Sequence, residues 1–224
     1  MIDLYYNGNP LVSIILTTFN RSDYLKRAMD SFCRQSFKNA ELIVVDDGSN
    51  DYSYALVDDF VKQHANIRYM KHSNRKTSLS KNVGLMAAAG DFIGFLDSDD
   101  EYLPDFIEKR IQYLQDHADV DLIEGGAIII GDEFVPDKKD TTRLIHLSQC
   151  HIGSTFFGKK SVFFKLGGLD KHAGYAADSD FWERAEKFFR TATVDFPGYI
   201  YHRDTPGSIC NASYIKSKKD SPGN

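Results

Sequence analysis

The sequence has few cysteines, no excess of basic residues and no long apolar run. Cys33, Cys150 and Cys210 are widely spaced and outside any CxxC pair, so we expect reduced thiols of a cytosolic protein rather than disulfides or a zinc cluster. Lys and Arg number 27 against 32 Asp and Glu, a formal net charge of -5. That balance lacks the positive field that nucleic acid would require. The first ten residues do not resemble a signal peptide, and no stretch approaches the ~20 apolar residues of a membrane-spanning helix.

Several nucleotide-binding motifs are also missing. No GxGxxG follows the first predicted strand and no GxxxxGK[ST] occurs, which disfavours a dinucleotide-dependent dehydrogenase and a P-loop NTPase. A nucleotidyltransferase would share a doubly wound sheet and metal-binding carboxylates, but its opening loop is generally rich in glycine. Thr17–Arg21 contains no glycine.

The first half of the chain alternates strand and helix patterns. Apolar, β-branched runs predict strands, and apolar residues at helical spacing predict helices between them. Such alternation with short links predicts an α/β fold with a doubly wound, mainly parallel sheet. We expect strands at Leu11–Thr18, Glu41–Val45, Ile67–Lys71 and Phe92–Leu96, and helices capped by Ser22, burying Leu56, Val57, Phe60 and Val61, and spanning Ser78–Ala89 up to a C-terminal Gly90.

The second half is less regular, and we expect one domain over residues 1–212, with a donor half at about 1–100 and an acceptor half at about 101–212. Residues 213–224 should form a flexible tail. The predicted elements are a helix opening at Pro104 and burying Ile107, Ile111 and Leu114, a strand Leu122–Ile130, an exposed loop or hairpin Gly131–Thr142, a strand Ile152–Phe157, a helix Ser161–Leu166 stopped by Gly167-Gly168, and a helix from near Asp178 with Phe181, Trp182, Ala185, Phe188 and Phe189 on its apolar face.

Polar clusters follow three of the predicted parallel strands, at Thr17–Arg21, Asp46–Ser49 and Asp97–Asp100. Ligands of such sheets bind beyond the carboxyl ends of the strands, so the clusters should converge on one rim. The segment Asp97–Glu108 holds six acids and no Lys or Arg. Its carboxylates suit Mg²⁺ or Mn²⁺, and binding of a phosphate ligand should then require the metal. The alternative is a solvated turn followed by an acidic helix start.

The second cluster, Asp46–Asp51, contains three aspartates where a turn and a helix cap need only one. One of them could therefore accept an N–H from a nucleobase or a ribose hydroxyl. A turn that binds nothing is an equally good interpretation of this motif alone.

Several motifs in order resemble the family 2 glycosyltransferases, which are inverting, nucleotide-sugar-dependent enzymes with the GT-A fold. The resemblance covers roughly residues 10–205. It is carried by VSIILTTFNR at Val12–Arg21, ELIVVDDGSND at Glu41–Asp51, KNVG at Lys81–Gly84, GDFIGFLDSDD at Gly90–Asp100, GGLD at Gly167–Asp170 and ADSDFW at Ala177–Trp182.

The resemblance implies a donor site in the first half of the chain. Thr17 and Asp47 would contact the uracil, with Asp47 accepting its N3–H. Asn20 and Arg21 would lie near the nucleotide, although Arg21 could equally be a surface charge at a helix start. Lys81 stands where the family often has Arg, so a point charge would replace the guanidinium that can bind a phosphate through two hydrogen bonds.

The resemblance also implies the metal site and the catalytic base. Asp97 would hold the ribose, or the metal through water, and Asp99 would ligate the Mn²⁺ or Mg²⁺ that bridges the diphosphate. His202 could complete this site, although a lone His is more often structural. Asp178 matches the base, or it is a helix N-cap. Asp180 is a rival base, but residues two apart on a helix face different ways.

The implied reaction is an in-line displacement that moves a sugar from a nucleoside diphosphate, expected to be UDP, to a hydroxyl of a carbohydrate or lipid-linked saccharide. The product would be a cell-surface polysaccharide or glycoconjugate, made in the cytoplasm by a protein that could contact the inner face of the membrane. Ala177 replaces an acid that usually precedes the base, so a nucleotide-sugar-binding protein with impaired transfer is the main alternative, ahead of a nucleotidyltransferase. Gly131–Thr142 and Asp204–Ala212 could act as lids.

Overall fold

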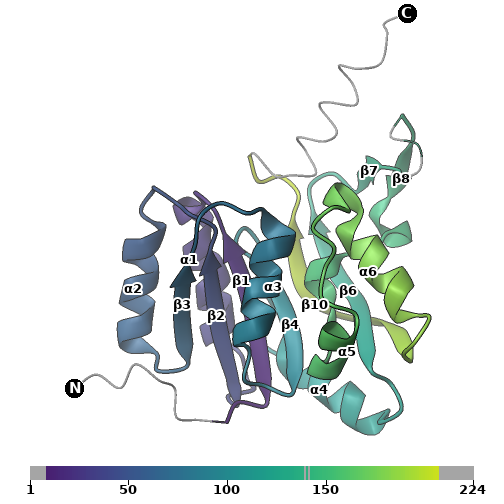
Figure 1. Cartoon of the computed structure of the whole chain (residues 1–224), viewed down its shortest axis with the longest axis horizontal. Coiled ribbons are helices and arrows are strands. Elements are labelled where there is room, and N and C mark those ends of the chain that lie inside the picture. Colours follow the sequence, from purple (N-terminus) through teal and green to yellow (C-terminus); the bar gives the residue numbers. More distant parts are fainter. Residues whose placement is uncertain (1–8, 139, 141, 207–224) are drawn as a thin grey trace, which may run out of the picture.

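A computed structural model describes residues 9–138, 140 and 142–206 (Figure 1). Its centre is an eight-stranded sheet in the order β3-β2-β1-β4-β9-β6-β10-β5, and β7 and β8 form a separate two-stranded sheet. The strands are β1 Val12–Thr18, β2 Ala40–Asp46, β3 Ile67–Lys71, β4 Phe92–Asp97, β5 Glu101–Tyr102, β6 Leu122–Ile130, β7 Phe134–Pro136, β8 Leu144–His146, β9 Phe157–Lys159 and β10 Thr191–His202.

The first four strands confirm the predicted parallel, doubly wound half. β1 pairs in parallel with β2 and with β4, and β2 pairs in parallel with β3. The second half is mixed, because β9 runs antiparallel to both β4 and β6, while β6 and β10 are parallel. The helices are α1 Ser22–Cys33, α2 Ser53–Gln63, α3 Thr77–Ala87, α4 Phe106–Asp116, α5 Lys160–Lys165 and α6 Ala177–Ala185, with short 3-10 turns η1 Leu147–Gln149, η2 Gly153–Thr155 and η3 Gly174–Ala176.

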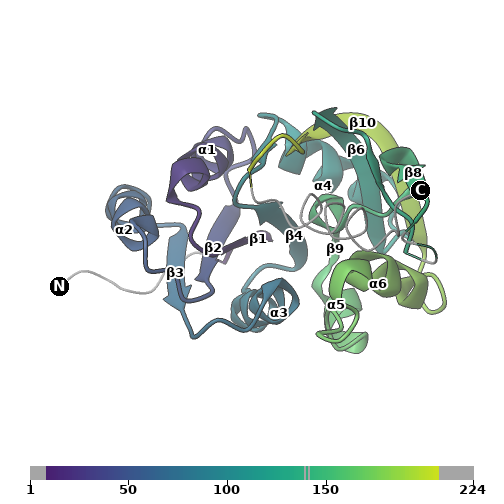
Figure 2. The ribbon, with the colours of Figure 1, turned by 90° about the horizontal axis from the view of Figure 1, so that it is seen from above.

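Helices cover both faces of the sheet, with α1 and α4 on one side and α3, α5 and α6 on the other (Figure 2). Alternate residues of β1 enter the two cores, because successive side chains of a strand point to opposite faces. Ile14 and Leu16 pack in the core that contains Leu25 of α1, whereas Ile15 packs in the core that contains Leu85 of α3. The sheet is therefore buried on both faces, as its continuous apolar strands predict.

Three local predictions in the first half are wrong. Ser22 does not cap α1: the N-cap is Arg21, and the backbone N–H of Ser22 donates to Asp51 Oδ2 at 3.0 Å. Val61 is 37% exposed rather than buried. Gly90 is not a left-handed helix terminus; α3 ends at Ala87, and a Cβ at Gly90 would lie 2.7 Å from the backbone N of Ser13 in β1.

The second half holds more corrections. The predicted strand Ile152–Phe157 is wrong, since Gly153–Thr155 forms η2 and β9 begins only at Phe157. Phe188 is 74% exposed beyond the end of α6, and Pro104 precedes α4 instead of opening it. For the exposed loop or hairpin expected at Gly131–Thr142, the structure has a hairpin that extends beyond these bounds, because β7 lies within them whereas β8 begins at Leu144. Gly167-Gly168 does end α5, with positive φ at both glycines.

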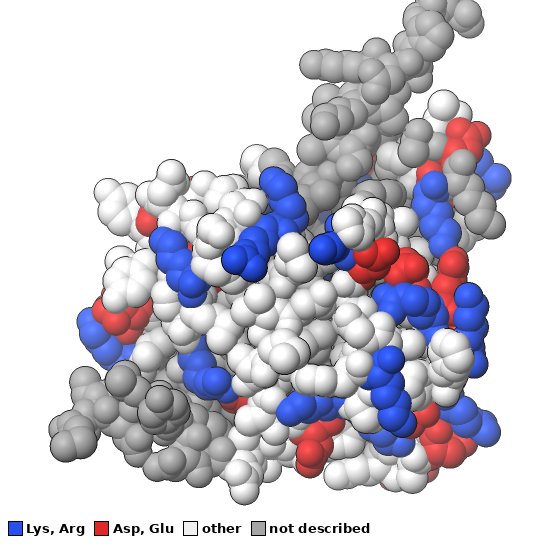
Figure 3. Space-filling view, in the orientation of Figure 1, with Lys and Arg blue, Asp and Glu red and all other residues white. Residues whose placement is uncertain are grey.

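Cys210, residues 207–212 of one predicted lid and the tail 213–224 lie outside the described residues. No described helix is both long and apolar enough to cross a bilayer. On the face shown in Figure 3, acidic and basic side chains lie interspersed over its right half. This face therefore has no extended patch of one charge, and binding of an anion depends on the charged groups at the binding site itself.

Candidate functional site

The carboxyl ends of β1, β2 and β4 open into one cleft of about 1270 Å³. The opposite wall comes from the second half of the chain, namely the β7–β8 hairpin, η2 and the start of α6. The cleft brings together the predicted site residues except His202, which is not among its lining residues. Those that line it are Thr17, Asn20, Arg21, Asp47, Lys81, Asp97, Asp99 and Asp178.

At one end of the cleft, Asp47 fixes the loop between β3 and α3. Its Oδ1 accepts the backbone N–H of Arg75 at 2.6 Å, and its Oδ2 accepts that of Lys76 at 2.9 Å. Lys76 is held at a φ of +74° and a ψ of 163°, a conformation that costs a non-glycine residue of order 1–3 kcal/mol. Asp47 has further lone pairs for a ligand, since a carboxylate offers about four acceptor sites.

Asn20 joins the loops that follow β1 and β2. Its backbone N–H donates to Ser49 Oγ at 2.9 Å, and its Oδ1 accepts the backbone N–H of Asn50 at 2.9 Å. Thr17, near the end of β1 and just before this junction, is buried and also lines the cleft. The two rim clusters predicted from the sequence are thus one connected surface.

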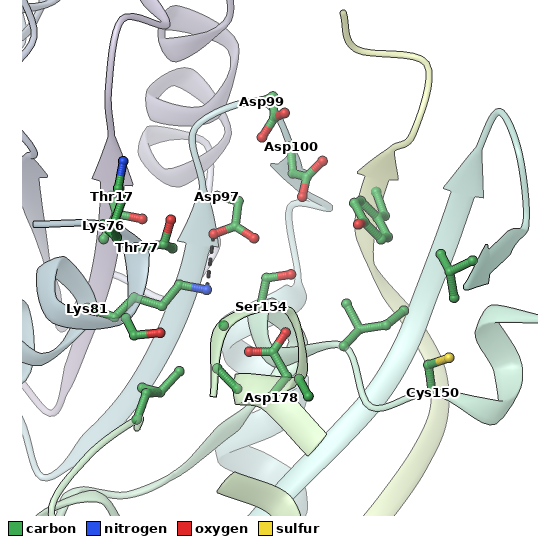
Figure 4. A pocket seen from close by; sticks show the side chains of 18 of the residues that line it. Thr17, Lys76, Thr77, Lys81, Asp97, Asp99, Asp100, Cys150, Ser154 and Asp178 are labelled. Carbon is green, nitrogen blue, oxygen red and sulfur yellow. Dashed lines mark ion pairs between the residues drawn. The ribbon is translucent and has the colours of Figure 1, made fainter. Parts of the chain in front are cut away.

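All three aspartates of the acidic cluster at the end of β4 line the cleft, and one of them, Asp100, also anchors the cluster. Lys81 Nζ lies 3.2 Å from Asp97 Oδ1 (Figure 4). Arg21 Nη1 lies 3.3 Å from Asp99 Oδ2. Burial, together with the negative charge of Asp97, raises the pKa of Asp99. Burial opposes the charged form of Lys81, but the neighbouring aspartates outweigh it and raise the pKa of Lys81. Lys81 therefore stays charged and, together with Arg21, offsets part of the cluster's negative charge.

Asp100 is buried and ties the cluster to β10. Its Oδ2 accepts the hydroxyl of Tyr199 at 2.6 Å, and its Oδ1 accepts the backbone N–H of His202 at 2.8 Å. Burial, and next the charges of Asp97 and Asp99, raise the pKa of Asp100 well above its ordinary value. The imidazole of His202 lies 3.0 Å from Glu101 Oε1 and is directed to that carboxylate.

The carboxylates of the cleft suit a divalent cation that is bound together with the phosphates of a substrate. Among residues 9–138, 140 and 142–206, no three His, Cys, Asp or Glu side chains form a ready metal cluster. Mg²⁺ and related ions are commonly bound by one or two carboxylates, substrate phosphates and waters. Asp97 and Asp99 on the cleft surface match that requirement.

Asp178 enters the cleft from the first turn of α6, across from Asp97 and Lys81 (Figure 4). It is not the N-cap, which is Ala176; its Oδ2 accepts the backbone N–H of Gly153 at 3.1 Å. Burial raises the pKa of Asp178, although the charge of Lys81 opposes the rise. Asp180 instead pairs with Arg184 at 2.8 Å and is absent from the cleft lining.

The sequence analysis missed two residues beside Asp178: His151, which lines the cleft, and Gly153, which contacts the Asp178 carboxylate. His151 Nδ1 lies 2.6 Å from Glu124 Oε1, and its ring stacks on Trp182 at 5.3 Å. The hydrogen bond with Glu124 raises the pKa of His151 and favours its charged form. The run Gly153-Ser154-Thr155 carries a turn signal that its apolar neighbours obscured.

Comparison with known proteins gives a consistent family assignment. Residues 13–174 match the family model described as glycosyl transferase family 2. The uncharacterised glycosyltransferase EpsJ of Bacillus subtilis is 28% identical over 226 residues, covering 92% of this chain and 64% of that protein. An uncharacterised glycosyltransferase of Rickettsia prowazekii is 30% identical over 201 residues, covering 84% of this chain and 61% of that protein. The chain thus spans about three fifths of the length of these relatives.

Solved structures share the fold. Staphylococcus aureus TarS, in complex with UDP-GlcNAc, superposes with a TM-score of 0.73 at 18% identity, covering 92% of this chain and 64% of that one. The mannosyltransferase PcManGT of Pyrobaculum calidifontis, in complex with GDP-Man and Mn²⁺, gives a TM-score of 0.68 at 19% identity, covering 98% and 67%. At these identities the likeness establishes the fold alone.

Proposed function

The chain belongs to glycosyl transferase family 2 and has the GT-A fold, and from that premise we propose that it transfers a sugar from a UDP-sugar to a hydroxyl acceptor with inversion at the anomeric carbon. One observation carries the proposal. A half-buried carboxylate, Asp178, faces the same cleft as Asp97 and Lys81, although it comes from the other half of the chain. A base opposite a diphosphate site is the arrangement that single displacement requires.

The donor would bind along the rim of the first four strands. Asp47 and Thr17 lie at the nucleobase end, where Asp47 keeps lone pairs for an N–H of the base. TarS binds UDP-GlcNAc whereas PcManGT binds GDP-Man, so a relative with this fold can carry either base. We propose that the base of the donor is uracil, and binding of a GDP-sugar in place of a UDP-sugar would show that this assignment is wrong.

A divalent cation, Mn²⁺ or Mg²⁺, would be held by Asp99 and Asp97 together with the diphosphate oxygens. When bound, such an ion supplies electrophilic stabilisation of the departing diphosphate. Lys81 and Arg21, which pair with these two carboxylates, lie close enough to turn toward the phosphates. Lys81 contributes as a compact point charge instead of a bidentate fork.

Asp178 would accept the proton of the acceptor hydroxyl as that oxygen attacks the anomeric carbon. A positioned general base contributes roughly 10²–10⁴-fold to such a step. Burial raises the pKa of Asp178 and so strengthens it as a base, while the charge of Lys81 limits the rise. The acceptor, a carbohydrate or lipid-linked saccharide, would bind against η2 and the β7–β8 hairpin, which line that side of the cleft.

The test uses the UDP that a donor releases on slow hydrolysis, because no acceptor is needed. A thermal-shift panel of UDP- and GDP-sugars with Mn²⁺ first identifies the donor, since stabilisation follows affinity. Asp178→Asn should then lower UDP release by roughly 10²-fold or more without weakening UDP binding in Mn²⁺. Asp180→Asn is the matched control, because that aspartate pairs with Arg184 outside the cleft lining, and should retain full turnover.

Normal turnover of Asp178→Asn would refute the assignment of the base. Failure of every nucleotide sugar to stabilise the protein or release its nucleotide would refute the proposed function. Binding without release would instead indicate the protein with impaired transfer that the Ala177 departure suggests.

A further inference from the structure

The short turn η2 is the nearest part of the chain to the Asp178 carboxylate. The backbone N–H of Gly153, its first residue, donates to Asp178 Oδ2 at 3.1 Å. A Cβ built on Gly153 would lie 2.7 Å from Oδ2 and closer still to Oδ1 and Cγ of Asp178. The carboxylate therefore rests directly against the bare α-carbon of this glycine.

Backbone conformation is not the reason for the glycine. Gly153 is not among the glycines with positive φ, so its conformation is one that other residues adopt readily. All three near atoms belong to the Asp178 side chain, and none belongs to a backbone. A larger residue at this position would thus be accommodated by moving the carboxylate, at little cost to the fold.

The turn is itself fixed on both sides. The Oγ1 of Thr155 accepts the backbone N–H of Gly125 in β6 at 3.1 Å and donates to the carbonyl of Ile152 at 2.7 Å. Ser154 hydrogen-bonds to Tyr199, whose hydroxyl donates to Asp100 Oδ2 at 2.6 Å. The same hydroxyl accepts the backbone N–H of Asp97 at 3.3 Å.

We propose that η2 is a positioning device for Asp178, in which Gly153 determines where the carboxylate sits and Thr155 and Ser154 hold the turn relative to β6 and the Asp97–Asp100 loop. Gly153 is a positioning residue, since it acts through Asp178. The inference rests on the proposed function, because it presumes that Asp178 is the base. It adds a structural link between the base and the diphosphate side of the cleft.

Gly153→Ala tests the device. The added methyl should displace the carboxylate by about an ångström, and misplacement on that scale can cost about 10²-fold in rate. We expect UDP release to fall 10- to 100-fold, with UDP affinity in Mn²⁺ within about threefold of the parent. Weakening the bond from Gly153 N–H removes a contact that favours the ionised form, so the acid limb of the pH profile should move to higher pH. The other charges that face Asp178 are Lys81, Asp97 and His151, and the substitution leaves them in place.

A double-mutant cycle separates positioning from a general structural effect. In the Asp178→Asn background, Gly153→Ala should add less than about twofold, because residues that act as one unit are not additive. An equal loss in both backgrounds would overturn the inference. Full activity of Gly153→Ala, while Asp178→Asn is inactive, would overturn it and leave the proposed base standing. Normal turnover of Asp178→Asn would remove the premise and the inference with it.

A second variant carries the test if Gly153→Ala does not fold. Thr155→Val keeps the volume of the side chain and removes both hydroxyl bonds that anchor the turn. It should lower UDP release by 3- to 30-fold and again show no further loss in the Asp178→Asn background. Unchanged release by this variant would overturn the role of the turn.

Discussion

Binding of UDP should depend steeply on a divalent cation, because the basic side chains beside Asp97 and Asp99 are already paired with these carboxylates. Lys81 is paired with Asp97, and Arg21 is paired with Asp99, so each of these charges is already balanced by a neighbour. Asp178 faces the same space. A diphosphate that entered without a metal would therefore meet no net attraction from these groups.

The loss of UDP affinity without metal can be estimated from the repulsion between one unpaired carboxylate and one charge of the diphosphate. At an effective dielectric constant of about 20, two unit charges about 5 Å apart interact by roughly 3 kcal/mol. That energy corresponds to about a hundredfold in Kd. We expect UDP to bind about a hundredfold more weakly in EDTA than in Mn²⁺ or Mg²⁺, at constant ionic strength, by isothermal titration calorimetry.

Asp99→Asn sharpens this prediction. Without metal, the variant should bind UDP more tightly than the parent, because one repelling charge is gone. With Mn²⁺ it should bind UDP more weakly, because a ligand is lost. Asp91→Asn is the matched control: Asp91 is exposed just before the start of β4, about 20 Å from Asp99 along the strand, and salt screens charges beyond about 8 Å. Equal UDP affinity with and without EDTA in the parent would refute the reasoning.

Three other properties should follow from buried charges. UDP release should fall with decreasing pH through a midpoint above pH ~4, since burial raises the pKa of Asp178 and only its ionised form accepts a proton. An acid limb at an ordinary aspartate pKa would contradict this. Glu41→Gln should lower the free energy of unfolding in urea by about 2 kcal/mol, because this buried carboxylate accepts hydrogen bonds from Ser13, Arg68 and Ala89. A decrease below about 0.5 kcal/mol would show that these hydrogen bonds do not stabilise the fold. Arg110→Met should preserve or raise the unfolding free energy, because burial lowers the pKa of Arg110 to about 9 and no described carboxylate pairs with it. A loss of stability above about 2 kcal/mol would show that the hydrogen bond of Arg110 to Gly125 and its stacking on Phe106 outweigh the cost of burying its charge.

Sequence patterns predicted the first half of the fold because its strands follow simple rules. β1, β2 and β4 are buried on both faces, so each appears as a continuous apolar run, and the helices between them carry apolar residues at helical spacing. The second half mixes parallel and antiparallel pairs, and its elements are short. The prediction for Ile152–Phe157 failed there, because η2 is buried against β4 and β6 and its apolar neighbours Ile152, Phe156 and Phe157 are also typical of a strand.

The sequence by itself determined that acidic and polar clusters gather at one rim, because parallel strands bring their carboxyl ends to the same edge of the sheet. The motifs also selected Asp178, whose distance along the chain from Asp97 conceals their proximity. Only the tertiary structure decided what surrounds these carboxylates. Pairing of Asp99 with Arg21, burial of Asp100 under Tyr199 and contact of Gly153 with Asp178 all join residues from different elements. Such contacts depend on how β9, β10 and α6 pack against the first sheet half, and packing of this kind leaves no local pattern in the sequence.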